Sequence, residues 1–226
     1  VRQAHYAASD ALHAKQGGVK FMHKCARVRD AISTERLGAD AVSTVGFECG
    51  GHPGMDDITS LILVPLTVDS VSIPVIAGGG FVDGRGLVAA LALGADGINM
   101  GTRFLVTQEA PVHAAVKQRM VEATERDTAL IFRTLRNTSR VFRNGVVEQV
   151  LAIEAQPGET QFEDIAPLVK GLRGRELFET GNLEHGVWSA GMVIGLIDDI
   201  PTCKELVKRI VAEAESIIRE RLNALL

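Results

Sequence analysis

The stretch IPVIAGGG (73–80) decides the fold, because it joins a short apolar, β-branched run to three consecutive glycines. An apolar run of this length, closed by turn residues, is typical of a strand buried on both faces. The next stretch, DGRGLVAALALG (83–94), has helical spacing, with Asp83 placed to cap its start and Gly94 placed to end it. The sequence therefore predicts a strand, a glycine loop and a helix in succession.

The same pattern of strand, polar or glycine-rich bend and helix occurs three more times around this stretch. Strands that alternate with helices predict a parallel sheet covered by helices, which is an α/β fold. The other strand candidates are VKFMHK (19–24), DAVSTVGF (40–47) and DGINMG (96–101), and helical patterns follow them at 26–38, 58–70 and 111–126.

The character of the chain changes after about residue 127. Residues 128–155 are rich in arginine and show no clear strand alternation, and residues 156–185 are rich in glycine, proline and charge. Residues 201–224 predict a long amphipathic helix with one apolar face. We therefore predict two domains: 1–126, the βα part, and 127–226, a mainly helical appendage.

The composition narrows the function classes. The chain has 226 residues and a net charge of -4, with no long basic run, so we expect neither nucleic acid nor a membrane surface as a partner. The three widely spaced cysteines favour a reducing cytoplasm over a disulfide framework or a zinc site. No apolar run is long enough for a membrane span, and the first residues lack the apolar core of a signal peptide.

Two loops are candidates for binding phosphate. AGGGF (77–81) and NMGTRF (99–104) each follow a strand, and ligands of α/β proteins bind at the carboxyl ends of the strands. Glycines before a helix expose backbone N–H groups to an anion. In a (βα)8 barrel these would be the loops after the last two strands. The alternative for the first loop is a tight turn with close helix packing.

The bend ECGGHPG (48–54) places one histidine among three glycines, a proline and Cys49. Glycines allow a ligand to approach the backbone closely, and histidine exchanges a proton near neutral pH. His52 is therefore a candidate catalytic residue, with an outward-pointing surface turn as the alternative. Nothing adjacent to Cys49 in sequence would lower its thiol pKa, which favours a packing role. Asp56 and Asp57 complement a helix start better than they would hold a metal, so we expect no metal site.

Taken together, these stretches resemble the FMN-dependent nitronate monooxygenases, formerly called 2-nitropropane dioxygenases, a family that includes related bacterial NADH:quinone reductases. The resemblance rests on PVIAGGGFVDGRGLVAALALGADGINMGTRFL (74–105), HKC (23–25) and GFECGGHPG (46–54), and it continues through LRNTSRVFRN (135–144) and WSAGMVIGLIDD (188–199). The glycine-rich block alone is shared with IMP dehydrogenase and flavin-type enoyl-acyl carrier protein reductases. The histidine bend (48–54) favours the nitronate monooxygenases among these families.

The resemblance implies a bound FMN and assigns roles to particular residues. The phosphate would be held around two glycine loops, Lys24 would point toward the flavin or a nicotinamide, and His52 would donate a hydrogen bond to a substrate oxygen or accept a carbon-bound proton. The implied catalytic residue is His52, and the implied cofactor-binding residues are Lys24, Gly50, Gly51, Gly78, Gly79, Gly80, Gly101 and Thr102.

The family resemblance also implies a TIM-type (β/α)8 barrel of which only the C-terminal four βα units are present, since about 125 residues precede the appendage and four strands are found where eight are required. The opening VRQAHYAASDALHAKQGG (1–18) also departs from the family pattern. The leading activity is oxidation of alkyl nitronates with O2. The alternatives are an NAD(P)H:quinone reductase that uses the same site, a non-catalytic phosphate-ligand-binding fragment, and a scaffold that pairs with another polypeptide. We expect a small-molecule substrate (nitronate, quinone or nicotinamide nucleotide), NADH or NADPH as a possible co-substrate, and a possible homo-oligomer.

Overall fold

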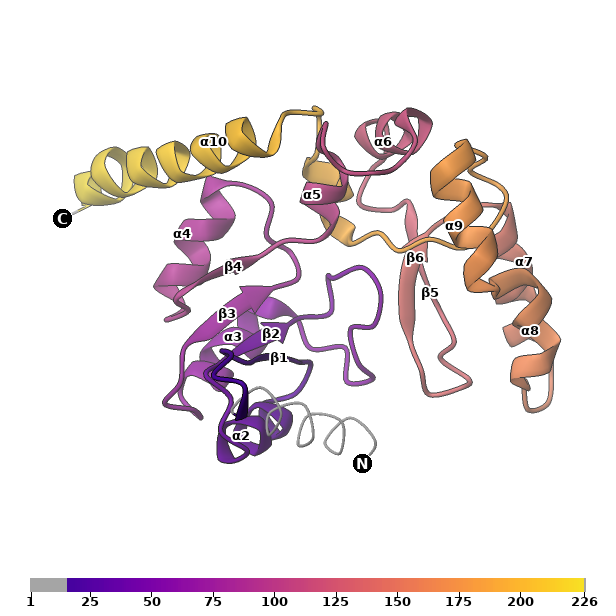
Figure 1. Ribbon diagram of the computed structural model, residues 1–226, viewed down its shortest axis with the longest axis horizontal. Coiled ribbons are helices and arrows are strands. Elements are labelled where there is room, and N and C mark those ends of the chain that lie inside the picture. The colour runs from indigo at the N-terminus through magenta and orange to yellow at the C-terminus, as the bar shows by residue number, and fades with distance from the viewer. Residues whose placement is uncertain (1–15, 226) are drawn as a thin grey trace. The chain divides into compact units, whose positions relative to one another are not determined.

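The computed structural model describes residues 16–225 and divides them into two compact units (Figure 1). The sheet unit contains 16–47, 56–99 and 210–225, and the hairpin unit contains 48–55 and 100–209. The sequence prediction placed residues 1–126 in one domain, whereas in this division 48–55 and 100–126 belong to the hairpin unit and 210–225 belong to the sheet unit. The expected departure of the opening residues from the family pattern lies mostly outside the described residues.

A parallel sheet forms the centre of the sheet unit, with its strands in the order β1-β2-β3-β4 (Figure 1). This confirms the α/β class and the four predicted strands, while the complete (β/α)8 barrel stays a prediction. The strands are β1 (Met22–Cys25), β2 (Ala41–Val45), β3 (Val75–Gly78) and β4 (Gly97–Asn99), and the helices are α2 (Val28–Arg36), α3 (Ser60–Val68) and α4 (Gly84–Ala92).

Helices α2 and α3 cover the same face of the sheet. The Cys25 thiol on β1 contacts the Thr34 hydroxyl of α2 at 3.9 Å, and the Thr44 hydroxyl on β2 contacts that of Thr67 of α3 at 3.2 Å. Cys25 and Thr44 are register partners, so their side chains lie on one face. The opposite face therefore carries the alternate residues of each strand.

The ends of α4 follow the sequence signals. The Asp83 carboxylate accepts a hydrogen bond from the Gly86 N–H at 3.0 Å, which is the expected N-cap. Gly94 ends the helix with φ +90°, a conformation that glycine adopts without steric cost. The first N–H of α4, on Gly84, donates at 2.7 Å to the Glu213 carboxylate in the C-terminal segment.

The hairpin unit contains two strands that the sequence pattern did not predict. Strands β5 (Thr128–Ile131) and β6 (Ser139–Phe142) form an antiparallel pair, so the expectation of a mainly helical segment after 127 missed this pair. Helix α6 (Ala114–Val121) is also shorter than the predicted 111–126. The other helices are α5 (Thr102–Leu105), α7 (Gly145–Glu154), α8 (Phe162–Val169), α9 (Gly171–Thr180) and the 3-10 helix η1 (Met192–Leu196).

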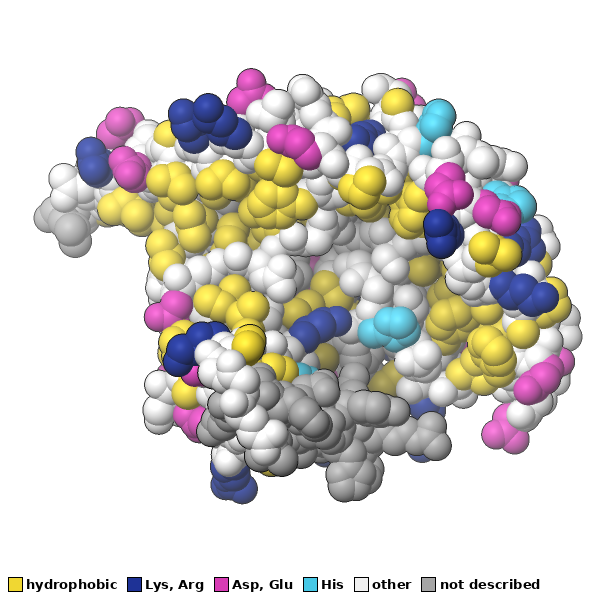
Figure 2. Space-filling view, in the orientation of Figure 1, with side chains coloured by type: hydrophobic (Ala, Val, Ile, Leu, Met, Phe, Trp, Pro, Cys, Tyr) yellow, Lys and Arg dark blue, Asp and Glu magenta, His cyan; other side chains and the backbone are white. Residues whose placement is uncertain are grey.

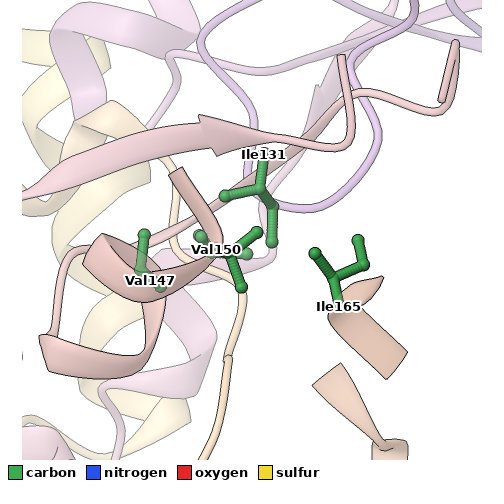
Figure 3. Packing of buried hydrophobic residues seen from close by; sticks show 5 residues of the cluster. Ile131, Val147, Val150 and Ile165 are labelled. Carbon is green, nitrogen blue, oxygen red and sulfur yellow. The ribbon is translucent and has the colours of Figure 1, made fainter. Parts of the chain in front are cut away.

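The core of the hairpin unit lies between the hairpin and the helices that follow it. Ile131 of β5, Val147 and Val150 of α7 and Ile165 of α8 are buried together (Figure 3). The Trp188 ring stacks on Phe142 of β6, with centroids 4.3 Å apart. Apolar burial of this kind is the main force that holds α7 and α8 against the hairpin.

Helix α10 (Cys203–Ser216) begins in the hairpin unit and ends in the sheet unit, and a π-helical segment, η2 (Ile217–Leu222), continues it. Hydrophobic side chains gather along this helix in Figure 2, and Val211 and Ile218 are among the exposed ones. Within residues 16–225, no helix is both long enough and apolar enough to cross a membrane.

Candidate active site

The glycine loop after β3 has the open backbone expected of an anion site. Gly79 and Gly80 have φ of +81° and +88°, and a Cβ at Gly79 would lie 2.8 Å from the Gly46 carbonyl oxygen. The Ser60 hydroxyl contacts the carbonyl oxygens of Gly78 and Gly79 at 3.0 and 2.5 Å, which fixes the orientation of these peptides. Among residues 16–225, the N–H groups of Gly79 and Gly80 donate to no protein group. Two amide donors are thus held in place for a ligand.

Lys24 lies at the carboxyl end of β1, on the sheet face that α2 and α3 leave uncovered. The next residue, Cys25, points to α2, and successive side chains of a strand point to opposite faces. The Lys24 side chain is exposed, whereas burial raises the pKa of the Cys25 thiol to about 11. The position of Lys24 agrees with a role toward a ligand at this face, and Cys25 is a packing residue.

The loop that carries His52 is fixed on one side by β6. Gly51 and Arg140 exchange two backbone hydrogen bonds, of 2.9 Å from Gly51 N–H and 2.6 Å from Arg140 N–H. The Thr138 hydroxyl contacts the Met55 sulfur at 3.0 Å and holds the end of the loop. His52 itself is exposed. The loop therefore presents its imidazole from a backbone that is held in place.

The segment that precedes η1 fixes the other side of this loop. Met192 N–H donates to the Glu48 carbonyl at 2.9 Å, and a Cβ at Gly50 would lie 2.8 Å from the backbone of Ala190 and Gly191. Only glycine allows such a close approach of two backbones. Gly50 is thus required for packing within the hairpin unit, which is a different reason from the predicted contact with a flavin ring.

Gly101 and Thr102 form the start of α5 and contact the same segment. Gly191 N–H donates to the Thr102 hydroxyl oxygen at 2.9 Å, so the Thr102 hydroxyl keeps its own hydrogen for a ligand. Gly101 is exposed, and a Cβ there would meet nothing within 4 Å. Its N–H donates to no protein group within the described chain.

The predicted site residues fall into two groups. In the hairpin unit, Gly50, Gly51, His52 and Thr102 are joined through Gly191 and its neighbours. In the sheet unit, Lys24 and Gly78 to Gly80 lie at the carboxyl ends of β1 and β3.

Sequence reasoning missed two residues that support these groups. Ser60 fixes the glycine loop from the start of α3, and Arg140 pairs with Gly51. Gly191, which lies in the WSAGMVIGLIDD stretch that carries the resemblance, links Thr102 to the histidine loop. The small residues in SAG (189–191) were the available signal for close backbone contact, whereas nothing in the sequence indicated the partners.

Other candidate sites are weaker. A pocket of about 360 Å³ in the hairpin unit is lined by Ile153, Gln156, Pro157, Gly158, Glu159, Thr160 and Asp164, and it contains none of the predicted site residues. Within residues 16–225, no group of three or more His, Cys, Asp or Glu side chains is arranged to hold a metal.

The comparison with protein families identifies the chain. Residues 6–213 match the nitronate monooxygenase family, and this match covers the β3 glycine loop, the histidine loop and the start of α5. The chain belongs to the nitronate monooxygenase family, which is a family of enzymes. The resemblance found in the sequence is thereby confirmed.

Individual relatives have different activities. The chain is 35% identical over 234 residues to the (3aS,4S,5R,7aS)-5-hydroxy-7a-methyl-1-oxo-octahydro-1H-indene-4-carboxyl-CoA dehydrogenase of Rhodococcus jostii (strain RHA1), covering 88% of this chain and 66% of that protein. FabK from Thermotoga maritima has a TM-score of 0.88 and 36% identity, covering 95% of this chain and 66% of FabK. Nitroalkane oxidase from Streptomyces ansochromogenes has a TM-score of 0.75 and 27% identity, and the match covers 94% of this chain and 61% of that protein. The chain thus spans about two thirds of the length of these relatives.

Proposed function

We propose that this chain is part of an FMN-dependent oxidoreductase that oxidises alkyl nitronates with O2. The family to which the chain belongs consists of oxidoreductases that generally use FMN. The observation that supports the nitronate activity best is the exposed His52 on a loop whose backbone is fixed at Glu48, Gly50 and Gly51. A nitronate carries two anionic oxygens, and an imidazole N–H is a suitable donor to one of them.

The residues present fit a phosphate-bearing cofactor. The N–H groups of Gly79, Gly80 and Gly101 are not used within the described chain, and the space beside Gly101 is open. The Thr102 hydroxyl adds a donor whose oxygen is already fixed by Gly191. In each unit, taken by itself, these groups are donors of the kind that bind a phosphate, through backbone N–H and hydroxyl groups and without a cationic side chain.

When bound, FMN supplies the ring that accepts electrons from the substrate and passes them to O2. The chain's own residues bind and orient the reactants. His52 holds an anionic substrate oxygen, or takes the proton from the substrate carbon when the neutral nitroalkane binds. Lys24, at the carboxyl end of β1, would favour negative charge on the ring by charge pairing.

We also infer that the four strands of the sheet unit belong to a longer barrel. The parallel order β1-β2-β3-β4 and the coverage of 66% of FabK support this. The first and last strands then find partners in further βα units. Cytoplasmic location, a quinone or nicotinamide substrate, and a homo-oligomer stay predictions.

A second candidate is dehydrogenation of a CoA ester at the same site. The Rhodococcus relative that matches 88% of this chain carries that activity in its name. In this case His52 would remove a proton from the substrate carbon instead of stabilising a nitronate oxygen. The two candidates share the cofactor and differ in the electron donor.

The experiment that separates these candidates is anaerobic reduction of the purified chain. We expect a yellow protein whose flavin absorbance bleaches when ethyl nitronate is added without air. Bleaching by a CoA ester alone would favour the dehydrogenase, and bleaching by NADH alone the quinone reductase. A colourless chain that takes up no added FMN would overturn the proposed cofactor and favour the binding fragment.

A further inference from the structure

Two adjacent residues of α5 contact the two ends of the segment that contains η1. Thr102 accepts the Gly191 N–H at 2.9 Å directly before η1. Arg103 donates to the Asp199 carboxylate at 3.0 Å and to the Asp199 carbonyl at 3.2 Å, three residues beyond η1. Residues 191–199, called here the η1 segment, are therefore attached to α5 at both ends.

Arg103 is an unusual residue for a purely structural contact. It is 2% exposed, and its Nε has no hydrogen-bond partner within residues 16–225. Burying a guanidinium with an unused donor costs stability, and a hydrophobic side chain of similar size often fills such a position at no loss. Burial lowers the pKa of Arg103, which reflects this unfavourable environment, although the group stays protonated at neutral pH.

Asp199 does not depend on Arg103 for a charge partner. Arg209 of α10 donates to both oxygens of Asp199, at 2.6 and 3.0 Å, and this guanidinium is half exposed. Removing Arg103 therefore leaves no buried unpaired carboxylate. A substitution of Arg103 therefore tests its contact with Asp199 while the Asp199 carboxylate stays paired with Arg209.

The η1 segment reaches the histidine loop at its other end. Gly191 lies against Gly50, and Met192 N–H donates to the Glu48 carbonyl. Arg103 thus acts on Thr102 directly, as its neighbour, and on the base of the His52 loop through Gly191.

We propose that Arg103 is a positioning residue: through Asp199 it holds the η1 segment against α5, and so orients both the Thr102 hydroxyl and the base of the His52 loop for the cofactor. This rests on the proposed FMN site for its functional part. The mechanical part, attachment of the η1 segment, does not depend on FMN.

The test compares Arg103→Met with the matched control Arg209→Gln in the full chain. Hydrogen exchange measured by mass spectrometry on peptides spanning 189–197 reports the attachment without any cofactor. For Arg103→Met we expect at least tenfold faster exchange of the Gly191 and Met192 amides, with a melting temperature equal to or above wild type. Arg209→Gln should leave this exchange unchanged.

The second measurement is FMN affinity, from quenching of flavin fluorescence. Arg103→Met should weaken FMN binding about tenfold while the fold stays intact, and Arg103→Lys should restore part of it. If exchange and affinity both equal wild type, or if Arg103→Met only lowers the melting temperature, the positioning role is wrong. If wild type binds no FMN but exchange still changes, the proposed cofactor fails and the attachment by Arg103 stands.

Discussion

Gly51 and Arg140 pair as a short antiparallel bridge, although 88 other residues separate them in the sequence, and both of their backbone N–H groups donate across it. The bridge pairs the backbone of Gly51, the residue before His52, with β6 of the hairpin. A histidine on a free loop would sample many positions, whereas this one starts from a fixed backbone.

His52→Ala should leave FMN bound and lower turnover of ethyl nitronate by roughly two to four orders of magnitude, because proton transfer and hydrogen bonding to the substrate are lost. Steady-state kinetics and the flavin spectrum measure the two effects separately. His185→Ala is the control, since His185 pairs with Glu176 at 2.6 Å, far from the loop in sequence. Equal turnover in His52→Ala and wild type would reject the catalytic role.

Gly101→Ala should change stability by less than about 0.5 kcal/mol, because φ is −98° and the space beside it is open. It should nevertheless weaken FMN binding, since the methyl group would fill the place proposed for the phosphate. Thermal unfolding and FMN titration distinguish the effects. Wild-type affinity in this variant would remove Gly101 from the site.

Gly79→Ala provides the contrasting case. The added Cβ would lie 2.8 Å from the Gly46 carbonyl oxygen at a φ of +81°, so strain of about 1 to 3 kcal/mol is expected. Urea unfolding of the cofactor-free chain should show this loss. A variant as stable as wild type would mean that the loop after β3 relaxes easily, contrary to its tie to Ser60.

Asp83→Ala should destabilise the chain by about 1 kcal/mol, because the N-cap hydrogen bond to Gly86 is lost from α4. Asp69→Ala is the control: Asp69 follows the end of α3, where a negative charge does not favour the helix. Urea midpoints of the two variants give the difference. Equal midpoints would show that solvent replaces the cap at no cost.

Acid stability should depend on Asp127. Its carboxylate accepts the Thr124 N–H at 2.7 Å, and this hydrogen bond lowers the carboxyl pKa below its ordinary value. A depressed folded-state pKa contributes stability above the unfolded value, near 4, and loses it as pH falls through the lower folded value. Asp127→Asn should therefore flatten the fall in urea midpoint below about pH 4. Thr124→Ala, which keeps the backbone bond, should flatten it less, and an unchanged slope in Asp127→Asn would contradict the assignment.

The sequence predicted the sheet well because each strand is a short apolar run followed by glycine or a polar bend. The N-cap at Asp83 and the end of α4 at Gly94 could also be predicted from the sequence, since both depend on residues within one helical turn. Local signals of this kind need no knowledge of distant partners.

The hairpin was not predictable in the same way. Strand β6 reads SRVF, and its Ser139 and Arg140 are buried together with the two apolar residues, so no alternation marks it. The partners of Gly50 and Thr102 lie about 140 and 89 residues away, a separation at which pattern gives no pairing. The glycines of the histidine bend indicated a close backbone contact, but only the structure identifies the contacting segment as the one around Gly191.

The hydrogen bond between Gly84 N–H and the Glu213 carboxylate has a consequence for synthesis on the ribosome. The two residues are 129 positions apart, so at 5 to 20 residues per second α4 emerges roughly 6 to 26 s before its acceptor. During that interval the nascent sheet has its inner strands but not the C-terminal segment that completes the helix terminus. The N-terminus of α4 therefore completes its hydrogen bonding late relative to its own synthesis, and a nascent chain that stalls within this interval would expose an unfinished surface to chaperones and proteases.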